Sequence, residues 1–333
     1  MLNVYGKSIE KNKMLKSMII GCGRIAGENY DLNDGMSHAS GYVNNNVELS
    51  VCIDVIDGKA KKFSEQYGCA IEYSIKDGLS KHNPDIVSIC TPDETHFLIS
   101  REILQSSHLP KVIFLEKPAC SNIKEYYELL ELSKINGVNI VVNYTRRFDE
   151  YHIQLRNMIS EGEYGEFYRG FATYYSGWQH NGVHLIDTLS FLLKDTFIIN
   201  RIFSVLPSPY ESDPTLELEL KAIKSKKNIT VLGVDEEYYQ IFDFSLLFTD
   251  SRLRIEDFGE KIIIEKKIVN NIKENVLEEI DNGLLPRKYS SMHNAIRIIS
   301  KAITNSDYSL LEGFTLSDVY NTMQTIWSAE YEI

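Results

Sequence analysis

The sequence predicts an α/β N-terminal domain with a doubly wound parallel sheet, followed by an α+β domain with a large, mostly antiparallel open sheet. From about residue 14 to 142, short apolar runs rich in β-branched residues alternate with longer helical periods. This alternation is typical of a parallel sheet covered by helices on both faces. From about residue 198 to 268, strand-like runs follow one another without a long helix, which favours antiparallel pairing. The length of 333 residues suits two domains.

The N-terminal elements are read from strand-length apolar runs and from helical periods with start and stop signals. Ser121 precedes the longest helical period and Gly137 follows it. The predicted strands are 14–21, 47–54, 84–91, 111–117 and 138–143, and the predicted helices are 57–68, 96–107 and 121–137.

The alternation of strands and helices ends at about Thr145. We therefore predict a domain boundary near this residue, with domains of residues 1–142 and 143–333. Helical periods cover 149–162, 180–195, 289–304 and 315–331. The predicted strands are 165–175, 201–206, 215–223, 228–234, 239–250, 251–259 and 261–269.

Composition excludes several classes of protein. The chain is 43% hydrophobic and 25% charged, which indicates a globular protein, and its net charge of −12 argues against nucleic-acid or membrane-surface partners. No apolar run is long enough to span a bilayer, and the polar N-terminus lacks a secretory apolar region. Five unclustered cysteines without zinc-type spacing indicate buried thiols in a reducing compartment. We therefore expect a cytoplasmic protein.

A glycine-rich turn directly follows the first predicted strand. Gly21, Gly23 and Gly27 lie in the sequence GCGRIAG, where glycines allow a tight turn and a close approach of backbone N–H groups to a pyrophosphate. The next strand ends in Asp54, 27 residues after Gly27, and a polar insertion (ENYDLNDGM) accounts for the long spacing. This pattern predicts a Rossmann-type dinucleotide site, the alternative being a glycine turn in another α/β protein.

Charge beside the glycine turn favours NAD over NADP. A carboxylate at Asp54 can accept hydrogen bonds from both ribose hydroxyls, whereas a 2′-phosphate there would meet like charge. Asp57 adds to this discrimination, and Lys59 is the nearby cation.

Two further strand ends point to the same edge of the sheet, because ligands bind at the carboxyl ends of parallel strands. One carries Thr91, Pro92 and His96, and the other carries Glu116 and Lys117. His96 is either a locally satisfied helix-start residue or a cofactor contact, and Lys117 either a solvated loop residue or a ligand of a substrate hydroxyl. The cofactor-binding residues that we predict are Gly21, Gly23, Arg24, Ile25, Asp54, Thr91, Pro92, His96, Glu116 and Lys117.

These motifs together resemble the Gfo/Idh/MocA oxidoreductases, named from glucose–fructose oxidoreductase and inositol dehydrogenase. The resemblance rests on GCGRIAG, Asp54, TPDETH, EKP, NYTRRFDEYH, GEFYRG and HNGVHLID in the family's order, over nearly the whole chain. It implies hydride transfer between a nicotinamide and a secondary alcohol of a sugar, polyol or nucleotide sugar.

The resemblance also implies that Lys117 and His184 are catalytic. A histidine can take the hydroxyl proton as hydride leaves, and a lysine can stabilise the developing alkoxide. Asp187, three residues after His184, is placed to hold the imidazole in one tautomer. The alternative is a core histidine in an amphipathic helix.

One position departs from the family pattern. Many members carry an aspartate four residues before the catalytic histidine, where this chain has His180. His180 is a second proton carrier or a substrate ligand, or else the site has lost its acid. His180 and His184 also have a zinc-like spacing, but the glutamate of HExxH and a third ligand are missing, so we expect no metal.

Substrate contacts are expected just after the strand 138–143 and around the histidines. Arg146 and Arg147 either clamp a carboxylate or diphosphate, or they are solvated or pair with Asp149 and Glu150. We expect Tyr174 to pack in the core and Trp178 to reach the site. The substrate residues that we predict are Lys117, Tyr144, Arg146, Trp178, His180, Asn181 and His184.

The leading hypothesis is an NAD-dependent sugar or nucleotide-sugar oxidoreductase. Two alternatives stay open: a redox-neutral glycosidase that uses NAD transiently, and a non-enzymatic NAD-dependent sensor. An apolar outer face of the second sheet would make the protein a homodimer or homotetramer.

Overall fold

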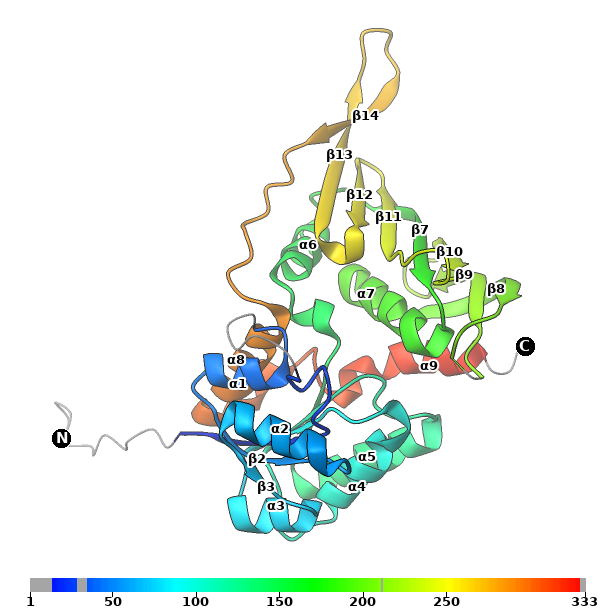
Figure 1. Cartoon of the computed structure of the whole chain (residues 1–333). Helices are drawn as coiled ribbons and strands as arrows, with labels where there is room; N and C mark the ends of the chain where they lie inside the picture. The colour runs from blue at the N-terminus through cyan, green and yellow to red at the C-terminus, as the bar shows by residue number, and fades with distance from the viewer. Residues whose placement is uncertain (1–13, 29–34, 211, 330–333) are drawn as a thin grey trace, which may run out of the picture. The chain divides into compact units, whose positions relative to one another are not determined.

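The computed structural model describes residues 14–28, 35–210 and 212–329 and divides into two compact units (Figure 1). Unit 1 comprises the chain up to Asn143 together with Tyr289–Leu316. Unit 2 comprises Tyr144–Lys288 and the chain from Ser317 onward. The segment 289–316 thus departs from the expected second domain of residues 143–333.

Unit 1 contains a six-stranded parallel sheet with the order β3-β2-β1-β4-β5-β6. The order reverses between β1 and β4, as in a doubly wound fold. The predicted parallel sheet is therefore confirmed. The strands are β1 (Lys16–Ile20), β2 (Glu48–Ile53), β3 (Ala70–Ile71), β4 (Ile86–Ile89), β5 (Val112–Leu115) and β6 (Asn139–Val142).

Polar caps mark the ends of the unit 1 helices. Ser37 forms a capping box with Ser40 at the start of α1, and Asn122 accepts two backbone N–H groups at the start of α5. The sequence did not predict the short helices α1 and α3, each of which contains a glycine. The helices are α1 (His38–Asn44), α2 (Asp57–Tyr67), α3 (Ile75–His82), α4 (His96–Leu104), α5 (Ile123–Asn136) and α8 (Ser291–Asn305).

Helix α8 returns to unit 1 because it packs against α1 (Figure 1). Gly41 on α1 makes room for this contact, since a Cβ there would lie 3.0 Å from Ile296 and 3.1 Å from Met292. The Asn45 amide donates to the carbonyl of His293. The amphipathic pattern of 289–304 predicts a helix but does not say which sheet it covers, so the boundary prediction missed this return.

Unit 2 contains an eight-stranded sheet with the order β14-β13-β12-β11-β7-β10-β9-β8. Every neighbouring pair is antiparallel except β7 and β10, so the predicted open, mostly antiparallel sheet is confirmed. The strands are β7 (Phe167–Tyr175), β8 (Phe197–Leu206), β9 (Thr215–Ala222), β10 (Asn228–Val234), β11 (Asp243–Phe248), β12 (Ser251–Glu256), β13 (Lys261–Val269) and β14 (Asn275–Ile280).

One face of this sheet is buried, because alternate residues along β9, β11 and β12 are inaccessible. Phe244, Leu246 and Phe248 of β11 point into this core. A π-helical turn at Trp178–Gly182 leads directly into α7. The helices of unit 2 are α6 (Glu150–Ser160), α7 (Val183–Leu193) and α9 (Tyr320–Ser328).

No helix in the described ranges has the length and apolar character needed to cross a membrane.

Candidate functional site

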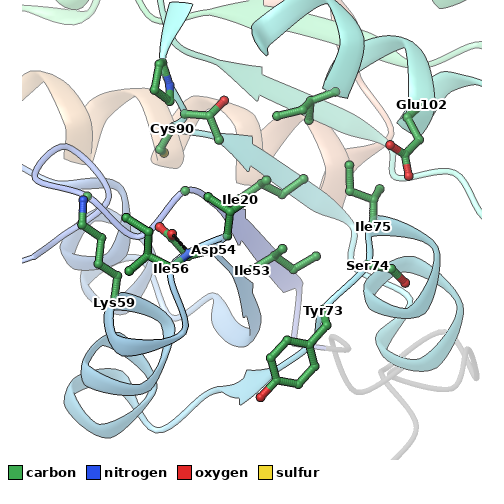
Figure 2. Close-up of a pocket in the computed structure, with 16 residues that line it drawn as sticks. Ile20, Ile53, Asp54, Ile56, Lys59, Tyr73, Ser74, Ile75, Cys90 and Glu102 are labelled. Carbon is green, nitrogen blue, oxygen red and sulfur yellow. Dashed lines mark hydrogen bonds between the residues drawn. The ribbon is translucent and has the colours of Figure 1, made fainter.

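Unit 1 has a pocket of about 640 Å³ at the carboxyl ends of its central strands (Figure 2). Strands β1 and β2 contribute Ile20 and Ile53 to its lining, and Cys90 comes directly after β4. The sheet order reverses between β1 and β4, and the crevice at such a reversal is where open α/β sheets bind ligands. The predicted residues Gly21, Gly23, Asp54, Thr91 and Pro92 all line it.

The glycines of the turn after β1 differ in what surrounds them. Gly21 has φ +87°, and a Cβ there would lie 2.8 Å from the backbone of Cys90. Gly23 borders open space, with no atom of the described chain within 4 Å of its would-be Cβ. Gly27, at φ +140°, packs against the Tyr67 hydroxyl. Gly21 and Gly27 therefore shape the turn, and Gly23 leaves room for a ligand beside the backbone.

Asp54 stands at the end of β2 with both carboxylate oxygens held by backbone N–H groups. Cys22 N donates to one oxygen at 2.8 Å, and Ile56 N donates to the other at 2.7 Å. Each carboxylate oxygen has two acceptor positions, so each keeps one for a ligand hydroxyl. The carboxylate is thus oriented into the pocket by the glycine turn itself.

Sequence reasoning missed the apolar wall of the pocket. Figure 2 shows Ile56 beside Asp54 and Lys59, with Tyr73 and Ile75 across the pocket. Asp57, expected to add to cofactor selection, instead pairs with Lys61 at 2.6 Å, and Lys59 lines the pocket. Their positions in the sequence could have indicated these wall residues, because the loops that follow the strands of a parallel sheet lie at the same edge of the sheet.

Five of the predicted cofactor residues do not line this pocket in the described structure: Arg24, Ile25, His96, Glu116 and Lys117. His96 is fully buried, with Nδ1 2.7 Å from the carbonyl of Pro118 and Nε2 2.9 Å from that of Thr91. His96 therefore forms hydrogen bonds with the protein's own backbone, which favours a structural role over a contact with the cofactor. It ties the loop after β4 to the loop after β5, which carries Lys117.

Glu116 belongs to a buried hydrogen-bond network. Its Oε1 accepts from the amide of Asn143 at 2.6 Å and lies 2.7 Å from Nε2 of His38. Burial by itself would raise the pKa of Glu116, but the His38 hydrogen bond and charge, the Asn143 amide and the charge of Lys117 outweigh it and lower the pKa. Glu116 is therefore a buried carboxylate. Nothing in the sequence marked His38 as its partner.

In unit 2, His180 and His184 follow one another through the π-helical turn and the start of α7. Both are half-buried. The His180 ring stacks on Tyr210, with ring centroids 4.1 Å apart, and its backbone N–H donates to Asp213 at 2.9 Å. The Tyr144 ring meets His184 edge-on at 6.3 Å.

Asp187 pairs with Arg147. Nη2 of Arg147 donates to Oδ1 of Asp187 at 2.8 Å and Nε donates to Oδ2 at 2.9 Å, while Thr322 donates to Oδ1. Arg147 was expected to clamp an anion or to pair with Asp149 or Glu150, but its partner is Asp187. The expectation that Asp187 orients His184 is not supported, because its oxygens serve Arg147 and Thr322.

Arg146 lies in an aromatic environment. Its guanidinium stacks 4.0 Å over the Phe242 ring and donates to the carbonyl of Phe258. Burial lowers the pKa of Arg146 to about 10, against the attraction of Asp149. Asp149 itself pairs with Arg287, so it is not the partner expected for Arg146 or Arg147.

Three of the predicted substrate residues are buried. Trp178 donates its indole N–H to the carbonyl of Ile326, which contradicts the expectation that it reaches the site. The Tyr144 hydroxyl donates to the sulfur of Met323, and the Asn181 amide donates to the carbonyl of Ser176. Tyr174 is in the core, as predicted. These three side chains lie next to the histidine motif or the strand end in the sequence, but each forms a hydrogen bond inside the protein. Their positions in the sequence do not reveal these hydrogen bonds.

The residues that the structure describes contain no group of three His, Cys, Asp or Glu side chains arranged to hold a metal ion.

A known protein family matches the N-terminal part of the chain. Residues 15–144 match the Gfo/Idh/MocA family model, described as an oxidoreductase family with an NAD-binding Rossmann fold. The matched range begins just before β1 and ends just after β6. This N-terminal part of the chain is similar to the Gfo/Idh/MocA oxidoreductases. The resemblance seen in the sequence is thereby confirmed for these residues.

Similar proteins extend the picture to the whole fold. Inositol 2-dehydrogenase of Salmonella typhimurium is 26% identical over 155 residues, which are 46% of this chain and 43% of that protein. The chain thus spans less than half of this relative's length. A solved inositol dehydrogenase homolog from Azotobacter vinelandii, complexed with NADH and myo-inositol, has a TM-score of 0.71 at 16% identity over 96% of both chains. KijD10, a 3-ketoreductase of Actinomadura kijaniata complexed with NADP, has a TM-score of 0.72 at 14% identity, over 94% of this chain and 95% of that chain.

Proposed function

We propose that this protein is an NAD-dependent oxidoreductase that transfers hydride to or from a secondary alcohol of a polyol, sugar or nucleotide sugar. The observation that carries the proposal is the pocket of the Gfo/Idh/MocA unit, where Gly23 leaves open space beside an oriented Asp54 carboxylate. Inositol 2-dehydrogenase is among the matching relatives and supports a polyol or sugar-like substrate.

Asp54 favours NAD as the cofactor. A 2′-phosphate on the ribose would lie against the Asp54 carboxylate, which the Cys22 and Ile56 N–H groups hold in the pocket. Lys59 on the same wall is the one side chain of the lining that can oppose this repulsion. The fixed position of Asp54 supports NAD over NADP.

Lys117 and His184 are the proposed catalytic pair. Nicotinamide, when bound, supplies the hydride acceptor or donor. His184, in the first turn of α7, takes the proton of the reacting hydroxyl. Lys117 holds the developing alkoxide by charge and hydrogen bonding.

His180 is the proposed substrate ligand or second proton carrier. Stacking on Tyr210 and the backbone bond to Asp213 restrict its ring and turn. Arg146, whose charge is partly desolvated, is a proposed substrate contact on the same unit. Lys117, His180, Arg146 and His184 are the side chains that we place against substrate; Tyr144 forms a wall behind His184.

We also propose a homodimer or homotetramer built on the open face of the unit 2 sheet. Several large apolar side chains of this sheet are exposed, including Phe171, Leu232, Ile198 and Phe203. Exposed large apolar side chains on a sheet support association through that sheet. The apolar residues Phe244 and Leu246 of β11, from which an apolar face was expected, point inward instead.

The test is hydride transfer with a defined polyol. Purified protein, NAD and myo-inositol are followed at 340 nm, and an increase is expected. Lys117→Met is expected to abolish the increase while NADH binding, measured by its fluorescence, stays within about threefold, since a methionine keeps the shape without the charge. Equal turnover by wild type and Lys117→Met would overturn the assigned role of Lys117.

A further inference from the structure

A continuous hydrogen-bond network in unit 1 ends on Glu116, the residue before Lys117. Glu116 Oε1 contacts His38 Nε2, and His38 Nδ1 lies 2.8 Å from the hydroxyl of Ser88. Ser88 in turn lies 2.6 Å from the Tyr42 hydroxyl. The network joins α1, β4 and the end of β5, and Asn143, just after β6, completes it through its bond to Glu116.

We propose that Glu116 is the counter-charge of Lys117, and that His38 is a positioning residue that holds this carboxylate in place and ionised. The inference rests on the proposed role of Lys117 as the catalytic lysine. It reassigns Glu116 from a cofactor ligand to a group that acts through its neighbour.

The burial of the network makes this assignment specific. His38, Ser88 and Tyr42 are fully inaccessible, and the Glu116 side chain is 13% exposed. A buried carboxylate is costly unless it is hydrogen-bonded and paired. Two strong donors on one oxygen provide that compensation, so the fold maintains the ionised form at this position.

The charges of Glu116 and Lys117 interact, since the charge of Lys117 is among the causes that lower the pKa of Glu116. The attraction that helps to lower the pKa of Glu116 is mutual, so the same energy favours the ammonium form of Lys117. An ammonium is the form that can stabilise a developing alkoxide. A cationic nicotinamide, when bound near Lys117, would favour loss of the lysine proton, and the negative charge of Glu116 would oppose that loss.

Four groups face Glu116 from the elements around it: His38 from α1, Asn143 after β6, Lys117 in the same loop and Cys90 at the end of β4. The Cys90 thiol is buried, and desolvation together with the charge of Glu116 raises its pKa, so it stays neutral. Burial likewise raises the pKa of the Tyr42 phenol. The only negative charge among these groups is therefore on Glu116.

The hydroxyls of Ser88 and Tyr42 hold the other side of the His38 ring. A Ser88 hydroxyl that donates to Nδ1 leaves the proton of the ring on Nε2, where it is donated to Glu116. The buried hydroxyl pair thus favours the tautomer that binds the carboxylate.

The first test is the reactivity of Lys117, which needs no substrate. Full-length protein is acetylated with acetic anhydride between pH 7 and 10, and modification of Lys117 is measured by peptide mass spectrometry. Glu116→Gln is expected to speed acetylation of Lys117 at pH 8 by about fivefold, because loss of the carboxylate releases free amine at lower pH. The control Glu131→Gln removes the same charge from α5, where Glu131 is exposed, and is expected to leave the rate unchanged. An unchanged rate in Glu116→Gln would overturn the proposal.

The second test uses the wild-type protein and covers the case in which Glu116→Gln does not fold. Long-range ¹⁵N–¹H NMR with labelled histidine reads which ring nitrogen of His38 carries a proton, with His38→Gln for assignment. A proton on Nε2 is expected between pH 6 and 8. A bare Nε2 would mean that Glu116 is the donor and is uncharged, which would overturn the proposal.

The two proposals fail separately. Faster Lys117 acetylation in Glu116→Gln, together with no NAD reduction by any alcohol, would leave the counter-charge assignment standing and remove the proposed reaction. NAD reduction by an alcohol, together with an acetylation rate of Lys117 that is the same in wild type and Glu116→Gln, would support the proposed reaction and remove the counter-charge assignment.

Discussion

The Arg147 guanidinium holds the Asp187 carboxylate through two of its nitrogens, in a pair that is almost fully buried. Asp187 lies one turn after His184 on α7, and Arg147 precedes α6, so the pair joins the segment after β6 to the helix that carries the proposed base. The charge of Asp187 acts against the burial of Arg147, so that the pKa of Arg147 is raised. The pair fixes the helix that carries His184.

Breaking this pair is expected to destabilise the fold strongly. Arg147→Met leaves Asp187 buried without its main partner and should cost about 3–5 kcal/mol of unfolding free energy. The partly exposed pair of Arg252 and Glu265 provides the matched control, since Arg252→Met should cost less than about 1 kcal/mol. Urea unfolding followed by circular dichroism measures both, and equal losses would contradict a special role for the buried pair.

The two glycines of the turn separate folding from cofactor binding. Gly23→Ala meets no neighbour in the described chain, so the melting temperature should change by no more than a few degrees while NADH affinity falls at least about tenfold. Gly21→Ala has the wrong φ and approaches the Cys90 backbone, and should lose stability. Thermal unfolding and NADH fluorescence titration give both numbers. Undiminished NADH affinity in Gly23→Ala would place the cofactor elsewhere.

Asp54 is expected to set cofactor choice. Asp54→Ser removes the like charge that opposes a 2′-phosphate, so the ratio of NAD affinity to NADP affinity should fall about tenfold or more. Asp57→Asn is the control, because Asp57 pairs with Lys61 outside the pocket lining. Calorimetric titration with both cofactors checks this. A ratio that changes equally in both variants would mean that overall charge, and not Asp54, sets the preference.

Asp149 gives the fold a pH dependence with a defined sign. Burial opposes its ionisation, but the hydrogen bonds and charges of His152 and Arg287 lower the pKa of Asp149 to about 2. A carboxyl group whose pKa is lower in the folded state stabilises above its ordinary value of 3.8, and this contribution disappears as the pH falls through 2. Asp149→Asn should therefore cost about 2 kcal/mol at pH 6, with the difference from wild type shrinking between pH 4 and pH 2. Urea unfolding at each pH measures it, and a pH-independent difference would contradict the assignment.

Much of the fold was predictable because periodicity reports burial directly. The strand runs around Ile19, Val87 and Phe114 are mostly apolar and almost fully buried, as expected when helices cover both faces of a sheet. The strand β14 was missed, because most of its residues are exposed and it carries little apolar signal. The return of α8 to unit 1 depends on Gly41, whose packing role no local pattern reveals.

The candidate site divides in the same way. Gly21, Gly23 and Asp54 were found because their chemistry and strand-end positions make a local motif. His38 received no assignment and Arg147 received the wrong partners, since their actual partners Glu116 and Asp187 lie 78 and 40 residues away. Trp178 shows the converse, because a side chain beside a motif had a distant partner at Ile326. Long-range hydrogen-bond partners are set by tertiary packing.

The central claim is hydride transfer, and nicotinamide absorbance tests it most directly. Pure protein and NAD are mixed with polyols, free sugars, uronic acids and nucleotide sugars, and the absorbance at 340 nm is followed together with analysis of the products. We expect absorbance to rise with one of these classes as the matching keto product appears. An unchanged absorbance with every compound, while NAD is shown to be bound, would contradict hydride transfer as the function of this protein. Free sugar released without absorbance change would then indicate the redox-neutral glycosidase, and no product at all would indicate the sensor.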